Sequence, residues 1–267
     1  MKMNEIQGSM HGRTAIITGA GSGIGKAAAV KLALMGANVA LFDLLDERTN
    51  KAEAEINALR EGSARAFDVD ITDPDRVEKA VLETVEIFGG VDIVFANAGI
   101  NGVLAPIDEM KLEEWEKTLK VNLNGTFLTV KYALPHLKKR GQGSIIITSS
   151  VNGTRTFSNF GMSAYSTTKA GQVAFAKMAA LELAKFKIRV NVICPGAIAT
   201  NIDQSTKKKD NLDEITIPVE YPEGSQPLAD GPGQPEEVAD LVAFLASDQS
   251  RHITGAQIFI DGAESLL

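Results

Sequence analysis

Tyr165 and Lys169 lie four residues apart in a segment that reads as a helix from Ala164 onward. Residues four apart on a helix share one face, so the phenol and the ammonium would lie one turn from each other. A free tyrosine has a pKa of about 10, and a neighbouring positive charge favours the phenolate. The pair therefore predicts a tyrosine acid/base whose pKa Lys169 lowers; the alternative is an ordinary helix surface.

A second candidate is the glycine-rich stretch TGAGSGIGKAA at positions 18–28, directly after the apolar run TAIIT. It is not a Walker loop, because Ala20 replaces the first glycine and Ala27 replaces the hydroxyl that ligates magnesium. The strict GxGxxG fingerprint also fails at Ile24. Small residues before a helix N-terminus still let a backbone approach a pyrophosphate, although a purely structural turn is the alternative. The glycines that remain are Gly19, Gly23 and Gly25.

Asp43 ends the next apolar run, NVALFD, and follows Gly25 by 18 residues. At this place a carboxylate can accept hydrogen bonds from both hydroxyls of an adenosine ribose, and it repels the 2′-phosphate of NADP. Neither Ser22 nor Leu44 supplies an arginine or lysine for that phosphate. The pattern favours NAD; the alternative is that Asp43 caps the next helix beside Asp46.

The elements that must position these residues alternate along the chain, because short β-branched runs are separated by segments of helical length. Near-continuous apolar strands joined by helices are typical of a parallel sheet covered on both faces. We therefore predict one doubly wound, Rossmann-type α/β domain over residues 1–267, with about seven parallel strands flanked by helices. The strand runs are TAIIT, NVALFD, ARAFDV, DIVFAN, SIIITSS, RVNVICPG and AQIFIDG.

Residues 201–233 interrupt this alternation, because they are polar and their prolines and glycines end any long helix. Ligands of open α/β sheets bind outside the carboxyl ends of the strands, where an insertion after a late strand can cover them. We expect a substrate lid here, with an ordinary surface loop as the alternative.

Composition excludes several classes of protein. The chain is 44% hydrophobic and 23% charged with a formal net charge of −7, which is ordinary globular usage without a nucleic-acid footprint. The run TKKKD at Thr206–Asp210 reads as a solvated helix face. No apolar run approaches the roughly 20 residues that span a bilayer, so we expect no membrane segment.

Cysteine and histidine usage bears on location and metals. Cys194 is the single cysteine, and the N-terminal residues lack the apolar region of a signal peptide, which favours a cytoplasmic protein. His11, His136 and His252 lie outside every motif, so we expect no metal.

Taken together, these residues resemble those of the short-chain dehydrogenase/reductase family along nearly the whole chain. One departure is Ala96 before Asn97, where the family usually has paired asparagines. The matching motifs are TGAGSGIG, Asp43, DITD at 70–73, ANAG at 96–99, VNLNGTF at 121–127, SSVNG at 149–153, YSTTK at 165–169 and PGAIAT at 195–200.

The resemblance implies a catalytic tetrad. Asn122 would hold a backbone carbonyl and a water in a proton relay, and Ser150, the second of two adjacent serines, would orient the substrate oxygen. Tyr165 would be the acid/base, and Lys169 would bind the nicotinamide ribose and lower the pKa of the tyrosine. Two residues more than the commonest family spacing separate Ser150 from Tyr165, which leaves the loop conformation open.

The resemblance also implies the cofactor contacts and the assembly. Asp70 and Ile71 would contact the adenine, residues 97–99 the adenosine half, and Ile198 and Thr200 the nicotinamide carboxamide. A homotetramer is implied, with the last strand and the tail AESLL near an interface. The full set of implied cofactor-binding residues is Gly19, Ser22, Gly23, Ile24, Gly25, Asp43, Asp70, Ile71, Asn97, Ala98, Gly99, Tyr165, Lys169, Pro195, Gly196, Ile198 and Thr200.

The favoured hypothesis is an NAD-dependent oxidoreductase that interconverts a secondary alcohol and a ketone by hydride transfer. Its small-molecule substrate is open: a polyol or sugar dehydrogenase and a 3-oxoacyl thioester reductase both fit, and Phe157, Phe160, Met162 and Tyr221 are candidate pocket residues. A dinucleotide-binding scaffold or sensor without catalysis is the alternative from another class. An α/β-hydrolase is excluded, because the GxSxG motif is absent.

Overall fold

The computed structural model describes residues 10–44, 47–221 and 224–267. Two sequence predictions fall outside this part of the chain. The first is the absence of a signal peptide, which depends on the N-terminal residues, and the second is the capping alternative that involves Asp46.

The predicted parallel sheet is confirmed. Seven strands pair in the order β3-β2-β1-β4-β6-β7-β9, and every neighbouring pair is parallel. Each of the seven predicted runs supplies one of them. The strands are β1 (Thr14–Thr18), β2 (Asn38–Asp43), β3 (Ala64–Asp68), β4 (Ile93–Ala96), β6 (Gly143–Thr148), β7 (Ile188–Pro195) and β9 (Gln257–Ile260).

Helices cover both faces of this sheet. Buried residues of α3, α5 and α6 form one core with the strands, and buried residues of α1, α2 and α7 form the other. Side chains alternate between the faces, so that Ile16 packs in the first core and Ile17 in the second. The helices are α1 (Gly23–Leu34), α2 (Glu47–Leu59), α3 (Pro74–Phe88), α4 (Leu112–Leu119), α5 (Gly125–Arg140), α6 (Ser163–Leu183) and α7 (Pro235–Ala246).

The strand order reverses between β1 and β4, because β2 and β3 extend the sheet on one side of β1 and the later strands extend it on the other. A crevice opens outside the carboxyl ends of strands at such a switch point, where α/β proteins bind their ligands. The glycine-rich loop follows β1 and the ANAG motif follows β4, so both lie at this crevice.

A second, two-stranded parallel sheet was not predicted. In it β5 (Gly102–Leu104) pairs with β8 (Thr206–Lys208), which joins the segment after β4 to the segment after β7. The prediction of a helix face for the triple lysine is therefore wrong. Lys207 and Lys208 are exposed on a strand, and Lys209 pairs with Glu114 at 3.2 Å. Pairing with β5, a long-range contact, overrides the local pattern.

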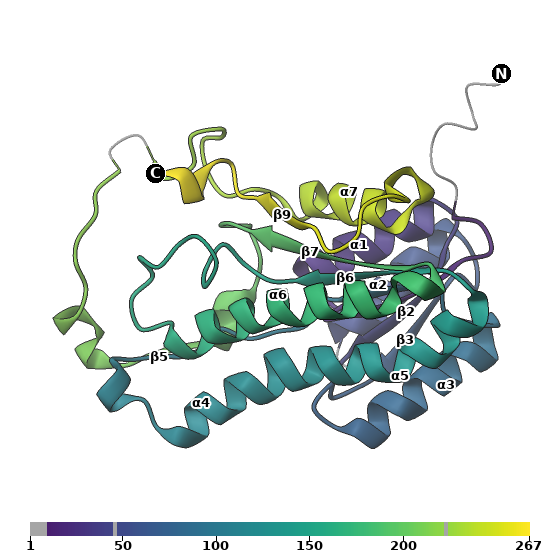
Figure 1. Cartoon of the computed structure of the whole chain (residues 1–267), viewed down its shortest axis with the longest axis horizontal. Helices are drawn as coiled ribbons and strands as arrows, with labels where there is room; N and C mark the ends of the chain where they lie inside the picture. The colour runs from purple at the N-terminus through teal and green to yellow at the C-terminus, as the bar shows by residue number, and fades with distance from the viewer. Residues whose placement is uncertain (1–9, 45–46, 222–223) are drawn as a thin grey trace.

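The segment 201–233 contains no long helix among its described residues, as predicted. Its two ends meet, because Ile198 and Gly233 form a parallel bridge and Ala199 N–H donates to the Gly233 carbonyl at 2.9 Å. In Figure 1 the segment extends beyond the sheet at the end of the molecule where β5 lies. Within the described residues, the short 3₁₀-helices are Ile107–Glu109, Ala184–Phe186, Ile202–Ser205, Asp210–Glu214, Asp248–Ser250 and Glu264–Leu266.

A π-helical turn, Lys120–Asn124, connects α4 directly to α5, so that the two form one long helix across the front of Figure 1. Such single turns inside an α-helix are frequent at functional sites. Asn122 lies in this turn and is fully buried.

Candidate active site

Tyr165 and Ser150 lie in contact at the carboxyl end of the sheet. The first turns of α6 carry Tyr165, which is 7% exposed, and Ser150 follows β6 and is 6% exposed. Burial raises the pKa of Tyr165 to about 12, and a hydrogen bond with the Ser150 side chain acts in the opposite direction. The two extra residues in the β6–α6 loop therefore do not separate this pair.

Lys169 is buried one turn after Tyr165. Its Nζ donates to the Thr148 carbonyl at 2.9 Å and lies 5.4 Å from the centre of the Tyr165 ring. Burial lowers the pKa of Lys169 to about 8. The pKa of Tyr165 moves opposite to the expected fall, because desolvation of the phenol outweighs the hydrogen bond with Ser150 that favours the phenolate.

Asn122 joins two segments of this site. Its Oδ1 accepts from Ile100 N–H at 2.9 Å, and its Nδ2 donates to the Ile100 carbonyl at 2.9 Å and to Thr168 Oγ1 at 3.0 Å. A Cβ on Gly99 would lie 3.1 Å from Asn122 Oδ1 and 3.6 Å from Lys169 Nζ. The π-helical turn (Asn122), the segment after β6 (Ser150) and α6 (Tyr165 and Lys169) therefore bring the four predicted catalytic residues to one end of the sheet.

The glycine-rich loop forms a close-packed turn at the start of α1. A Cβ on Gly25 would overlap the Gly19 carbonyl, and a Cβ on Gly21 would lie 2.6 Å from Thr49 Oγ1. Ser22 is the N-cap residue but its side chain makes no capping bond, and the first turn of α1 has no acidic residue. The N–H groups of that turn are thus left for an anion, which fits the diphosphate of a dinucleotide.

Asp43 lies beside this loop at the end of β2. Its Oδ2 accepts from Gly21 N–H at 2.7 Å and its Oδ1 from Leu44 N–H at 2.8 Å. These bonds fix the carboxylate next to the glycine turn, where the ribose of a dinucleotide would be held.

Asn97, the one asparagine kept from the family pair, connects three strands. Its N–H and the Ala98 N–H donate to Thr18 Oγ1 at 2.9 and 3.0 Å. Its Nδ2 donates to the Thr18 carbonyl at 3.2 Å, and its Oδ1 accepts from Thr148 Oγ1 at 3.0 Å. Asn97 thereby holds the ends of β1, β4 and β6 together.

The predicted adenine contacts lie farther along the same edge. Asp70 follows β3 and accepts from Thr72 N–H at 2.8 Å, and Ile71 is buried with its side chain directed at Gly125. A Cβ on Gly125 would collide with the Ile71 side chain, so the glycine makes room for it.

The segment after β7 carries the predicted nicotinamide contacts, and the C-terminal residues hold it. Ala197 N–H donates to Glu264 Oε2 at 2.8 Å, and Gln226 Nε2 donates to the Ala197 carbonyl at 3.1 Å. A Cβ on Gly23 would lie 3.2 Å from Thr200 Cγ2, so this segment also reaches the glycine loop.

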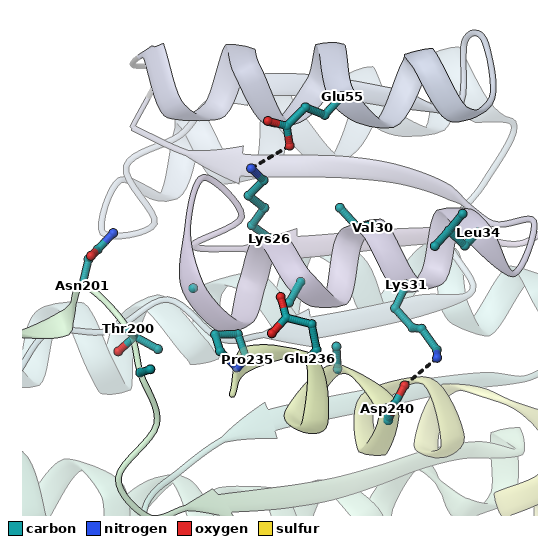
Figure 2. A pocket seen from close by; sticks show the side chains of 14 residues that line it. Lys26, Val30, Lys31, Leu34, Glu55, Thr200, Asn201, Pro235, Glu236 and Asp240 are labelled. Atoms are coloured by element: carbon teal, nitrogen blue, oxygen red, sulfur yellow. Dashed lines mark ion pairs between the residues drawn. The ribbon is translucent and has the colours of Figure 1, made fainter. Parts of the chain in front are cut away.

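A groove of about 610 Å³ lies between α1, α2 and α7 (Figure 2). Two ion pairs cross it, Lys26 with Glu55 at 2.7 Å and Lys31 with Asp240 at 2.5 Å. None of the four predicted catalytic residues lines it, whereas the predicted cofactor contacts Gly23 and Thr200 do.

Several residues of the site were missed by sequence reasoning. Thr18 and Thr168 belong to the quoted motifs TGAGSGIG and YSTTK, so their place in the site was readable from the sequence. Thr148 and Glu264 carried no spacing signal, because their partners are far away in the sequence.

Comparison with known proteins indicates the same family that the sequence resembles. A family model described as enoyl-(acyl carrier protein) reductase matches residues 19–263. Cyclohexanol dehydrogenase from an Acinetobacter species is 36% identical over 97% of both chains. The crystal structure of a 3-ketoacyl-ACP reductase from Sinorhizobium meliloti is 48% identical with a TM-score of 0.90, and covers 95% of this chain and 99% of that one.

A further solved structure, a 3-ketoacyl-(acyl-carrier-protein) reductase from Brucella melitensis complexed with NADH, is 30% identical with a TM-score of 0.84, covering 96% of this chain and all of that one. The chain belongs to the short-chain dehydrogenase/reductase family, whose members are oxidoreductases that bind a nicotinamide dinucleotide. None of the helices in the described part of the chain has the length and apolar character of a membrane span.

Proposed function

We propose that this protein is an NAD-dependent oxidoreductase that interconverts a secondary alcohol and a ketone. The observation that carries the proposal is the meeting of Asn122, Ser150, Tyr165 and Lys169 at the end of the sheet where Asp43 flanks the glycine loop. When bound, NAD supplies the acceptor and donor of hydride. A relative bound to NADH supports this cofactor, and the Asp43 carboxylate disfavours a 2′-phosphate.

The side chains of this site then have separate tasks. Tyr165 takes the hydroxyl proton during oxidation and returns it during reduction, and Ser150 orients the substrate oxygen beside it. The Lys169 ammonium lies 5.4 Å from the ring and favours the phenolate as the reaction needs it. The residues that would hold the cofactor are Gly19, Ser22, Gly23, Ile24, Gly25, Asp43, Asp70, Ile71, Asn97, Ala98, Gly99, Tyr165, Lys169, Pro195, Gly196, Ile198 and Thr200.

Replacement of Tyr165 by phenylalanine tests this proposal. Tyr165→Phe should lower kcat by about a thousandfold or more, because proton transfer is lost, while the ring still fills its buried place. The dissociation constant of NADH, measured by fluorescence, should stay within about twofold of wild type. Turnover near the wild-type rate would contradict the acid/base role. Binding of NADH by a wild type that turns over no alcohol or ketone would favour the scaffold hypothesis.

A 3-oxoacyl thioester reductase is the second candidate, because the Sinorhizobium meliloti protein that is 48% identical bears that name. The cyclohexanol dehydrogenase relative favours a free cyclic alcohol instead. Rates measured with cyclic alcohols, sugars, polyols, steroids and 3-oxoacyl thioesters, each with NAD(H) and NADP(H), would separate these substrates. A kcat/KM for the thioester above all others would establish the second candidate.

We also infer that residues 1–267 form one domain in which residues 201–233 act as a lid. Support for the lid comes from its joined ends at Ile198 and Gly233 and from its pairing with β5. We propose a homotetramer, by family analogy. We propose a cytoplasmic location, since Cys194 is a buried free thiol.

A further inference from the structure

Gln172 is a buried polar residue on the helix that carries the predicted acid/base. It follows Lys169 by three residues and Tyr165 by seven on α6, which places all three on one side of the helix. Its side chain is only 1% exposed. No motif of the sequence includes it.

The amide of Gln172 is bonded to the π-helical turn. Its Nε2 donates to the Asn122 carbonyl at 3.0 Å and to Thr126 Oγ1 at 2.8 Å. The Thr126 hydroxyl also donates to the Asn122 carbonyl, at 2.7 Å. Because a carbonyl only accepts, the orientation of the amide is determined by these partners.

The other half of the amide is not satisfied. No donor among the described residues reaches Gln172 Oε1, which is buried. A buried acceptor without a partner costs about 1–3 kcal/mol, and a leucine of similar shape would avoid that cost. A residue that only filled this space would therefore be apolar. The bonds that Gln172 Nε2 donates are the reason we infer for a polar residue here.

What Nε2 holds is the main chain of Asn122. Thr126 and Gln172 both donate to that carbonyl, and these two bonds fix its position. The Asn122 side chain in turn contacts Ile100 and Thr168, the neighbours of Gly99 and Lys169. A shift of the π-helical turn would therefore displace both the segment after β4 and the part of α6 that carries Lys169.

We propose that Gln172 is a positioning residue, which fixes the π-helical turn so that the Asn122 amide holds the segment after β4 against α6. The inference rests on the proposed function, because the site that it aligns is the one assigned to Tyr165 and Lys169. Gln172 itself touches neither substrate nor cofactor in this role.

The first variant is Gln172→Leu, which keeps the volume and removes the donors. We expect kcat to fall about tenfold, because small displacements of catalytic groups are costly, and KM to change less than about twofold. The free energy of unfolding should change little, since the orphan acceptor is removed together with the two bonds.

The second variant is Gln172→Glu, which tests the hydrogen bond without the cofactor. Burial raises the pKa of a glutamic acid, and only its protonated form can donate to the Asn122 carbonyl. The folded pKa then exceeds the unfolded one, so the bond stabilises at low pH and is lost as pH rises through the folded value. Thermal unfolding of the cofactor-free variant and wild type, measured over a range of pH, gives the midpoint at which the variant loses stability. The ratio of variant to wild-type kcat should fall at the same midpoint.

Thr84→Val on α3 is the matched control. It removes a buried hydroxyl whose 2.8 Å bond goes to Ala80, so stability should fall without a change in the kcat ratio. The positioning role is overturned if Gln172→Leu keeps the wild-type kcat. It is also overturned if the stability of Gln172→Glu changes with pH while its kcat relative to wild type does not. If Tyr165→Phe keeps wild-type turnover in the same assay, the proposed function fails instead.

Discussion

At the residue scale, the ionisation of the site depends on burial more than on neighbouring charge. Tyr165 and Lys169 are both buried, and burial moves the pKa of each toward its neutral form: upward to about 12 for the phenol and downward to about 8 for the ammonium. The protein therefore carries a cation that folding does not favour. This is common where catalysis needs a charged group away from water.

Replacement of Lys169 by methionine should stabilise the protein at neutral pH. The pKa of Lys169 falls from 10.5 to about 8 on folding, which corresponds to roughly 3 kcal/mol at neutral pH. Loss of the hydrogen bond to the Thr148 carbonyl removes about 1 kcal/mol of this gain in stability. The expected net gain at pH 7 is thus on the order of 1–2 kcal/mol, with loss of turnover.

The sign of this effect should depend on pH. Because the folded pKa is lower than the unfolded one, the wild type regains stability as pH rises from about 8 toward 10.5. Chemical denaturation of Lys169→Met and wild type at pH 7 and pH 10.5 would measure the difference. An equal difference at both pH values would show that the ammonium carries no folding cost.

Asp43 determines the choice of cofactor in the proposed function. Asp43→Ala should lower the preference for NAD over NADP by about tenfold or more, because a carboxylate that accepts ribose hydroxyls and repels a 2′-phosphate is removed. The ratio of kcat/KM values for the two cofactors measures this preference. Leu44→Ala, at the neighbouring exposed position, is the control. An unchanged ratio in Asp43→Ala would remove Asp43 from the ribose site.

At the element scale, the segment after β7 is held from outside the sheet. The C-terminal 3₁₀-helix supplies Glu264 to the Ala197 N–H, and residue 226 of the proposed lid supplies a donor to the Ala197 carbonyl. Both backbone polar groups of Ala197 are thus bonded to remote parts of the chain. This element is predicted to contact nicotinamide, so its rigidity should affect cofactor binding.

Glu264→Ala should weaken NADH binding by about three- to tenfold, because the bond to Ala197 N–H is lost and the segment must be ordered on binding. Glu264→Gln keeps an accepting oxygen and should restore most of the affinity. Fluorescence titration with NADH gives both constants, and thermal unfolding checks that the fold is intact. Equal weakening in the two variants would indicate that charge, and not this bond, is responsible.

At the scale of the whole molecule, the sheet brings together residues from every part of the chain. The strand order reverses beside β1, and the loops that follow the parallel strands β1, β2, β4, β6 and β7 all leave the sheet at the same edge. In the proposed tetramer, the surface around the C-terminal residues would contact a neighbouring subunit. Leu266 and Leu267 are 73% and 59% exposed in the single chain, so the proposed tetramer would have these side chains available for an interface.

The proposed assembly predicts a mass near four times 28.4 kDa by light scattering. Leu266→Asp combined with Leu267→Asp should shift the protein toward smaller assemblies, because charges would replace apolar contacts at the interface. Leu59→Asp, at a leucine of α2 that is 57% exposed, is the matched control and should leave the mass unchanged. A monomeric wild type would contradict the proposal.

The sequence by itself determined the sheet and the helix that carries Tyr165 and Lys169. Apolar runs and helical periodicity are local signals, and β1, β2 and α6 lie where those signals placed them. The glycine spacing and Asp43 were also readable, because a strand, a glycine turn, a helix and a second strand follow one another within 30 residues.

Only the tertiary structure decided how the site is held and ionised. The π-helical turn with its Gln172 bond, the β5–β8 pairing and the Glu264 contact join residues far apart in the sequence, so no local pattern could indicate them. The direction of the Tyr165 pKa was mispredicted for the same reason. Spacing places a charge beside a phenol, but desolvation depends on everything that packs around it, and that is a property of the folded chain.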